Sequence, residues 1–161
     1  MKKTVLRFVL VLGIIALLTS CFSLLSARTY RLTADEDLPA DQNVTVTFTG
    51  ADLLVVKKWN NRNIKEELYG SRDVTNNDTT VLTVPAGNNS FTFSISFLIG
   101  NTIHRQGDVE LKYNLESGKK YQISGIVKSL GFLKGSEMYV GIYDATKNAA
   151  LLKEWKLGET N

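Results

Sequence analysis

The chain has 161 residues, with 19 basic and 16 acidic side chains and one cysteine. This is the length of one ordinary domain, long enough to bury a core without disulfides, and a lone cysteine excludes a disulfide within the chain. Lys2, Lys3 and Arg7 belong to the amino-terminal signal described below, and without them 16 basic and 16 acidic residues remain. A neutral domain has no net field that attracts nucleic acid, so no nucleic-acid partner is expected.

The amino terminus has a positive start, an apolar run and a small polar end. Residues 8–18 form an uncharged apolar run, followed by Thr19 and Ser20. The run is shorter than the roughly 20 apolar residues that a membrane span needs. Residues 1–20 therefore have the three-part layout of a secretory signal.

The sequence Leu18-Thr19-Ser20-Cys21 resembles the bacterial lipobox. In lipoproteins of that family, the cysteine thiol is joined to diacylglycerol, the chain is cut before it, and the new amino group takes an N-acyl chain such as palmitate. The resemblance implies a signal peptide over residues 1–20 and membrane lipid bound through Cys21, with no other cofactor. Phe22 stands where an aspartate would favour the inner membrane, so the outer membrane is favoured if the cell has two. The alternative is an uncleaved amino-terminal membrane anchor.

Residues 21–43 are expected to be the lipidated cysteine and a tether, with a short strand at residues 27–32 as the alternative for that part. From residue 44 the hydrophobic period becomes two. Residues 44–49, 90–97 and 109–115 alternate apolar and polar side chains, which is the pattern of a strand with one buried face. Runs rich in Val, Ile and Tyr, which suit pleated sheets, occupy residues 52–59, 80–84, 121–127 and 138–144.

Glycine-bearing turns separate these runs. They predict a hairpin of residues 44–49 with 52–59, and another of residues 107–115 with 119–127. Residues 149–157 fit either a helix or an edge strand, and the neighbouring strands favour a strand. The whole pattern predicts an all-β domain over residues 44–161: an antiparallel β-sandwich of seven to eight strands, or alternatively a small β-barrel. No helix is expected outside the signal.

The turn and strand sequences VPAGNNSFTF and YNLESGKKYQI resemble a pattern of small bacterial envelope domains, including PEGA-like surface domains and other β-sandwich lipoproteins. In those domains, a proline-glycine turn leads into one strand and a glycine-lysine turn leads into a tyrosine-bearing strand. The resemblance covers about residues 80–127 and implies a fold, without any functional residue.

Catalytic and metal-ligating patterns are sparse. His104 is the only histidine, so the several His or Cys ligands of a zinc site are not supplied. A serine triad would need His104 as its base, but the chain has no Gly-x-Ser-x-Gly nucleophile pattern. We expect no catalytic residue and no metal site. Paired carboxylates meet only in space, so a small envelope hydrolase that uses them is the alternative from another class.

Two segments are candidates for binding. Residues 57–78 form a long connection that carries Trp59, Arg62 and Tyr69, a combination of aromatic and forked side chains that suits a glycan or a peptide. Residues 129–135 place Phe132 and Leu133 between glycines, where an exposed tip would dock on a protein or a membrane. The sequence therefore predicts a lipid-anchored cell-envelope lipoprotein that acts as a non-enzymatic binding or assembly module, with an envelope protein or glycan as partner.

Overall fold

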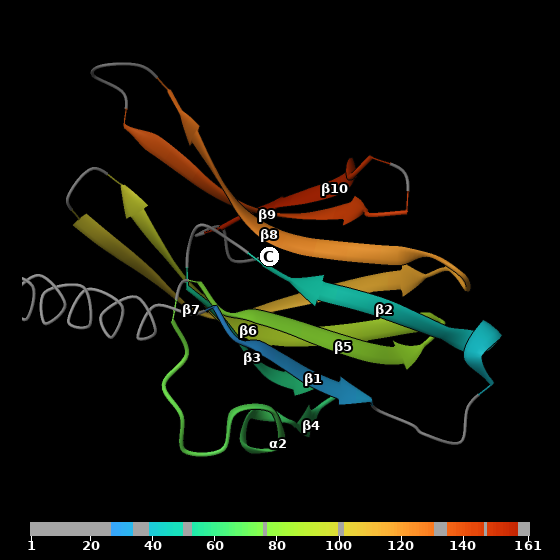
Figure 1. Ribbon diagram of the computed structural model, residues 1–161. Coiled ribbons are helices and arrows are strands. Elements are labelled where there is room, and N and C mark those ends of the chain that lie inside the picture. Colours follow the sequence, from blue (N-terminus) through green and yellow to red (C-terminus); the bar gives the residue numbers. More distant parts are fainter. Residues whose placement is uncertain are drawn as a thin grey trace, which may run out of the picture.

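Ten strands lie in two sheets in the part of the chain that the structure describes. A computed structural model describes residues 27–33, 39–49, 53–75, 77–99, 102–130, 135–146 and 148–157. The sheets face each other and do not close into a barrel (Figure 1). The predicted all-β sandwich is therefore confirmed, with ten strands in place of the seven or eight expected.

The larger sheet has six strands in the order β1-β5-β2-β8-β9-β10, and the smaller has four in the order β4-β3-β6-β7. A 3-10 turn, Ala40–Gln42, precedes β2, and one short α-helix, α2, spans Lys65–Tyr69. The strands are β1 Thr29–Thr33, β2 Asn43–Phe48, β3 Leu54–Trp59, β4 Arg62–Asn63, β5 Thr79–Pro85, β6 Gly87–Ile99, β7 Thr102–Leu115, β8 Lys120–Ser129, β9 Ser136–Asp144 and β10 Ala150–Lys156.

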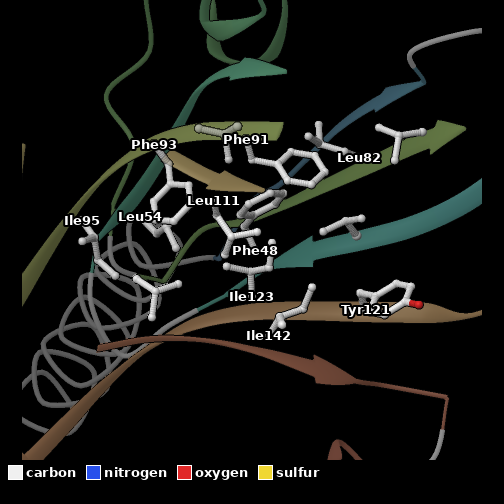
Figure 2. Close-up of a cluster of buried hydrophobic side chains, with 14 of the residues drawn as sticks. Phe48, Leu54, Leu82, Phe91, Phe93, Ile95, Leu111, Tyr121, Ile123 and Ile142 are labelled. Carbon is white, nitrogen blue, oxygen red and sulfur yellow. The ribbon is translucent and has the colours of Figure 1, made fainter. Parts of the chain in front are cut away.

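The hydrophobic core lies between the sheets. Successive side chains of a strand point to opposite faces, so the alternating apolar residues of β6 all enter this space. Phe91, Phe93 and Phe97 are fully buried, and the ring of Phe48 on β2 packs edge-on against Phe91 at 5.4 Å between centroids. Figure 2 shows Phe91 and Phe93 of the smaller sheet facing side chains of the larger sheet, among them Phe48, Leu82, Ile123 and Ile142. The period-two interpretation of β6 is thus confirmed.

Neither predicted hairpin forms. β2 belongs to the larger sheet and β3 to the smaller, and β7 and β8 are likewise divided between the sheets. The hairpins that do form are β6–β7, β8–β9 and β9–β10, together with the small β3–β4 unit. The predicted turns are therefore crossings between the layers. In addition, β1 pairs with β5 and β2 pairs with β8 in parallel, so the larger sheet is mixed and not purely antiparallel.

The segment predicted as a tether contains part of the sandwich. β1 begins at Thr29, close to the alternative strand at residues 27–32, and its Tyr30 is buried in the core. Any tether that follows Cys21 must therefore end before Thr29. Residues 1–26, which include the predicted signal and Cys21, lie outside the described residues.

The connection at residues 57–78 contains structure that the sequence analysis did not expect. Ile64 and Leu68 are four residues apart and both are buried, which is the spacing of one helical face. α2 covers the side of the sandwich next to β1 (Figure 1). There the rings of Tyr69 and Tyr30 meet edge-on, with 4.8 Å between their centroids. The expectation of no helix is therefore wrong, whereas the strand favoured for residues 149–157 is confirmed as β10.

Candidate functional site

The site begins at the turn between β3 and β4. Asn60 and Asn61 both have positive φ, 45° and 66°, a conformation that asparagine tolerates better than most residues and that suits a two-residue hairpin turn. The Asn60 backbone N–H donates to the Ser90 carbonyl at 2.9 Å, and the Ser90 N–H donates to Asn60 Oδ1 at 2.8 Å. These two bonds hold the turn against the start of β6.

Asn89 forms the base of the site. It is buried, and its Nδ2 donates to the carbonyls of Pro85 at 2.9 Å and Gly87 at 3.0 Å. Its Oδ1 accepts a hydrogen bond of 2.7 Å from Trp59 Nε1. Because a buried amide without partners is costly, these three bonds make Asn89 the structural link between the β5–β6 crossing and the Trp59 ring.

A hollow of about 360 Å³ lies beside this link, where the start of β6 runs next to the end of β7. We call it the amide hollow. Its volume falls within the range of about 300–1,000 Å³ that is usual for small-molecule sites. It is lined by Asn60, Asn88, Asn89, Ser90, Lys112, Tyr113 and Asn114.

The exposed groups of the amide hollow are mainly uncharged donors and acceptors. Asn88 stands directly opposite Asn114, and Ser90 stands opposite Lys112. Each side-chain amide offers two donors and one acceptor oxygen, and Lys112 adds a cation, which lies 3.2 Å from Glu110. Tyr113 is half-buried, with its ring packed edge-on against Tyr121 at 5.9 Å. The arrangement can hydrogen-bond a neutral polar ligand on the outer face of the sheet, whereas the Tyr113 ring points to the core-facing side of β7.

The predicted binding residues of the 57–78 connection differ in their exposure to solvent. Trp59 is half-buried and packs on the core behind the amide hollow, so it supports Asn89 instead of presenting an open face. Arg62 is its cross-strand partner and is exposed, with its guanidinium 2.8 Å from each carboxylate oxygen of Glu67.

Tyr69 is not available for binding. It is 3% exposed, its hydroxyl accepts from the Val56 N–H at 3.1 Å, and it shares a 2.8 Å hydrogen bond with Thr80 Oγ1. Burial raises the pKa of its phenol, and the hydrogen bonds with Thr80 and Val56 partly offset that rise. The prediction of Tyr69 as a contact residue is corrected: it links α2 to both sheets.

Phe132 and Leu133 lie outside the described residues, which resume at Gly135. The predicted binding residues did not include Asn88, Asn89, Lys112, Tyr113 or Asn114. The signal that was available is the density of asparagine around residues 60 and 88. The first group lies in the predicted binding connection of residues 57–78, whereas the second was assigned to a turn. Their meeting depends on the pairing of β6 with β7, which the sequence analysis did not predict.

No protein-family model, curated protein or solved structure matches this chain. Within the described ranges, no group of three or more His, Cys, Asp or Glu side chains is placed to hold a metal ion. The same residues include no helix that is long and apolar enough to cross a bilayer.

Proposed function

We propose that this chain is a lipid-anchored lipoprotein of the bacterial cell envelope, and that its sandwich is a non-enzymatic binding module. The anchor is Cys21, supported by the charged, apolar and small-residue segments before it. Phe22 favours the outer membrane in a cell with two. The resemblance of residues 80–127 to small envelope domains agrees with this placement.

The observation that carries the binding role is the amide hollow. Its exposed lining offers the amides of Asn88 and Asn114 and the hydroxyl of Ser90. A site of this kind, with several uncharged donors and acceptors close together, fits a small neutral polar ligand such as a glycan. The residues that line it include no carboxylate, so the hollow supports a binding module over a hydrolase that would need two of them.

The anchor is tested by replacing Cys21 with alanine. Lipidation needs the thiol, and the lipoprotein cut follows lipidation, so Cys21→Ala is expected to accumulate as unprocessed precursor. Mass spectrometry of the wild-type protein is expected to find acyl chains on residue 21. A Cys21→Ala protein that still appears at mature size with the detergent partitioning of the wild type would refute the anchor.

The binding role is tested with an array of envelope glycans, comparing wild type with a double Asn88→Ala, Asn114→Ala variant. Both side chains are exposed, so the variant should fold like the wild type while losing two amide contacts to the ligand. Hydrogen bonds between neutral groups contribute about 0.5–1.5 kcal/mol each, so the loss of two should weaken binding by roughly 5- to 150-fold.

Asn77→Ala is the matched control, because Asn77 is an exposed amide remote from the hollow in the chain, in the loop before β5. It should bind like the wild type. If the wild type and the double variant bind every glycan with equal affinity, the amide hollow is not the binding site. If the protein hydrolyses a glycan, it is an enzyme and not a binding module.

A further inference from the structure

Two hairpins extend beyond the same end of the sandwich. β2 ends at Phe48, opposite Ile123, yet β8 continues to Ser129 and returns as β9. At about 3.3 Å per residue, this extension reaches roughly 20 Å past the end of β2. In the smaller sheet, β3 begins at Leu54 opposite Ile95, and the β6–β7 hairpin continues past it to Ile99. Figure 1 shows both hairpin ends projecting to the left of the molecule.

Large exposed apolar side chains gather on these hairpin ends. Leu98 is 64% exposed and Ile103 is 60% exposed, and the two stand directly opposite each other on β6 and β7. On the other hairpin, Val127 is 40% exposed, and Leu130, just after β8, is 45% exposed. Four of the six large apolar residues exposed in the described chain therefore lie at this one end, and such patches mark contact surfaces. We call these four residues the apolar tips.

The chain enters the sandwich at the same end. Tyr30 of β1 pairs with Thr80, which pairs with Phe48, so Tyr30 lies level with Ile123 in the sheet. β1 and β8 run in opposite directions, because β1 is parallel to β5, β5 is antiparallel to β2, and β2 is parallel to β8. The amino-terminal end of β1 therefore points the same way as the carboxyl-terminal end of β8, toward the end of the β8–β9 hairpin.

The length of chain before β1 matches the reach of the hairpins. Cys21 precedes Tyr30 by nine residues, which span at most about 30 Å when fully extended. The β8–β9 hairpin extends about 20 Å past the level of Tyr30. Measured along the direction of β8, a lipid on Cys21 can therefore lie no more than about 10 Å beyond that tip, so the anchor is short enough to bring the tips to the bilayer when they face it.

We propose that the apolar tips are a membrane-contacting surface, which rests on the lipid bilayer that holds the Cys21 anchor. This proposal depends on the lipid anchor of the proposed function. Leu98 and Ile103 enter the interfacial region, and the exposed Arg105 next to them places a cation at the level of the lipid headgroups. The anchor and the tips together fix the orientation of the domain on the membrane.

This orientation places the amide hollow on the side away from the membrane. The hollow lies at Asn88 and Asn114, near the start of β6 and the end of β7, whereas Leu98 and Ile103 of the apolar tips lie at the far end of the same two strands. A ligand then approaches the domain from the aqueous side, without competition from the bilayer.

The test uses the full lipidated protein in vesicles of phosphatidylethanolamine and phosphatidylglycerol. Because the Cys21 thiol carries lipid, a cysteine introduced by Ile103→Cys or Leu130→Cys is the only free thiol and takes an environment-sensitive fluorophore. Lys120→Cys is the matched control, because Lys120 is exposed at the opposite end of β8. We expect blue-shifted emission and strong quenching by lipids brominated in the upper acyl chain at positions 103 and 130, and neither effect at position 120.

Vesicle flotation and the mass of the peptide that contains Cys21 distinguish failure of the lipid anchor from failure of the membrane-contacting tips. If the protein floats with the vesicles but position 103 is quenched no more than position 120, the anchor stands and the membrane-contacting tips are overturned. If Cys21 carries no lipid and the protein does not float, the anchor and the tips both fail. Cross-linking of position 103 between two copies without lipid quenching would assign the tips to a protein contact and overturn the proposal.

Discussion

At the scale of single residues, two polar side chains connect elements that are distant in the sequence. Asn89 joins Trp59 to the β5–β6 crossing, and Tyr69 joins α2 to Val56 and Thr80. Both are buried, and both use their polar atoms internally. A buried polar group that is fully hydrogen-bonded fixes one arrangement of the chain, because any other arrangement leaves donors or acceptors unpaired.

The apolar face of β6 permits a paired test of the core. Phe93 is fully buried whereas Thr92, the next residue, lies on the opposite face of the strand. Phe93→Ala is expected to lower the free energy of unfolding by about 3–5 kcal/mol, because it removes a ring and leaves a cavity. Thr92→Ala should change it by about 0.5 kcal/mol or less. Urea denaturation measures both, and similar losses would contradict the packing of β6.

At the scale of elements, the connections decide how the strands are shared between the sheets. The turns after β2 and β7 were predicted to close hairpins, but each carries the chain from one layer to the other. Alternation tells which side chains face the core and says nothing about which sheet holds the strand, since both sheets present an inward face. A short turn is compatible with either outcome, so the choice depends on packing between the layers.

A carboxylate clamp at Asp78 adds to the parallel pairing that attaches β1 to the larger sheet. Asp78 Oδ1 accepts from the Arg28 N–H at 3.0 Å, and Oδ2 accepts from the Thr75 N–H at 2.8 Å. Partial burial acts to raise the pKa of Asp78, but these hydrogen bonds outweigh it and hold the pKa below its usual 3.8. The clamp thus fastens the start of β1 to the loop before β5.

We expect Asp78→Ala to lower the melting temperature at neutral pH and to speed amide exchange in β1. Because the pKa is lower in the folded state, the stabilisation is fully present above the usual pKa of 3.8 and is lost as the pH falls through the folded value. The difference in melting temperature should therefore shrink in acid. Asp73→Ala, an exposed neighbour, is the control. A constant difference at every pH would contradict the clamp.

At the scale of the whole molecule, the two sheets approach closely where β8 crosses β6. A Cβ atom on Gly125 would lie 2.6 Å from Phe97 Cε1 and 2.9 Å from Ile95 Cδ1, both of which are buried. Only a residue without a side chain leaves room for these two core residues. Beyond this point the two long hairpins continue toward the apolar tips.

Gly125→Ala should therefore destabilise the sandwich. Crowding a packed interior typically costs about 1–3 kcal/mol, because the neighbouring side chains or strands must move. Gly107→Ala is the matched control, since a Cβ on Gly107 meets nothing within 4 Å, and it should stay within about 0.5 kcal/mol of the wild type. Chemical denaturation compares the two, and a neutral Gly125→Ala would show that the sheets are not held this close.

The sequence by itself determined the fold class and much of the core. The alternation of β6 was sufficient to identify Phe91, Phe93, Ile95 and Phe97 as buried. A strand with one solvent-exposed face and one buried face alternates polar and apolar residues along the sequence. It also favoured a strand at the carboxyl end, where β10 is found. These are local properties, set by the two-residue repeat of the extended chain.

Only the tertiary structure decided the partners of the strands, and with them the candidate site. The amide hollow exists because Asn88 and Asn114, far apart in the chain, stand opposite each other on β6 and β7. Tyr69 is buried because α2 turns it toward β1. The apolar tips lie at the same end of the sandwich as the start of β1, because β8 and β1 run in opposite directions. Pairing and layer assignment depend on contacts between distant residues, which the local pattern of a single sequence does not contain.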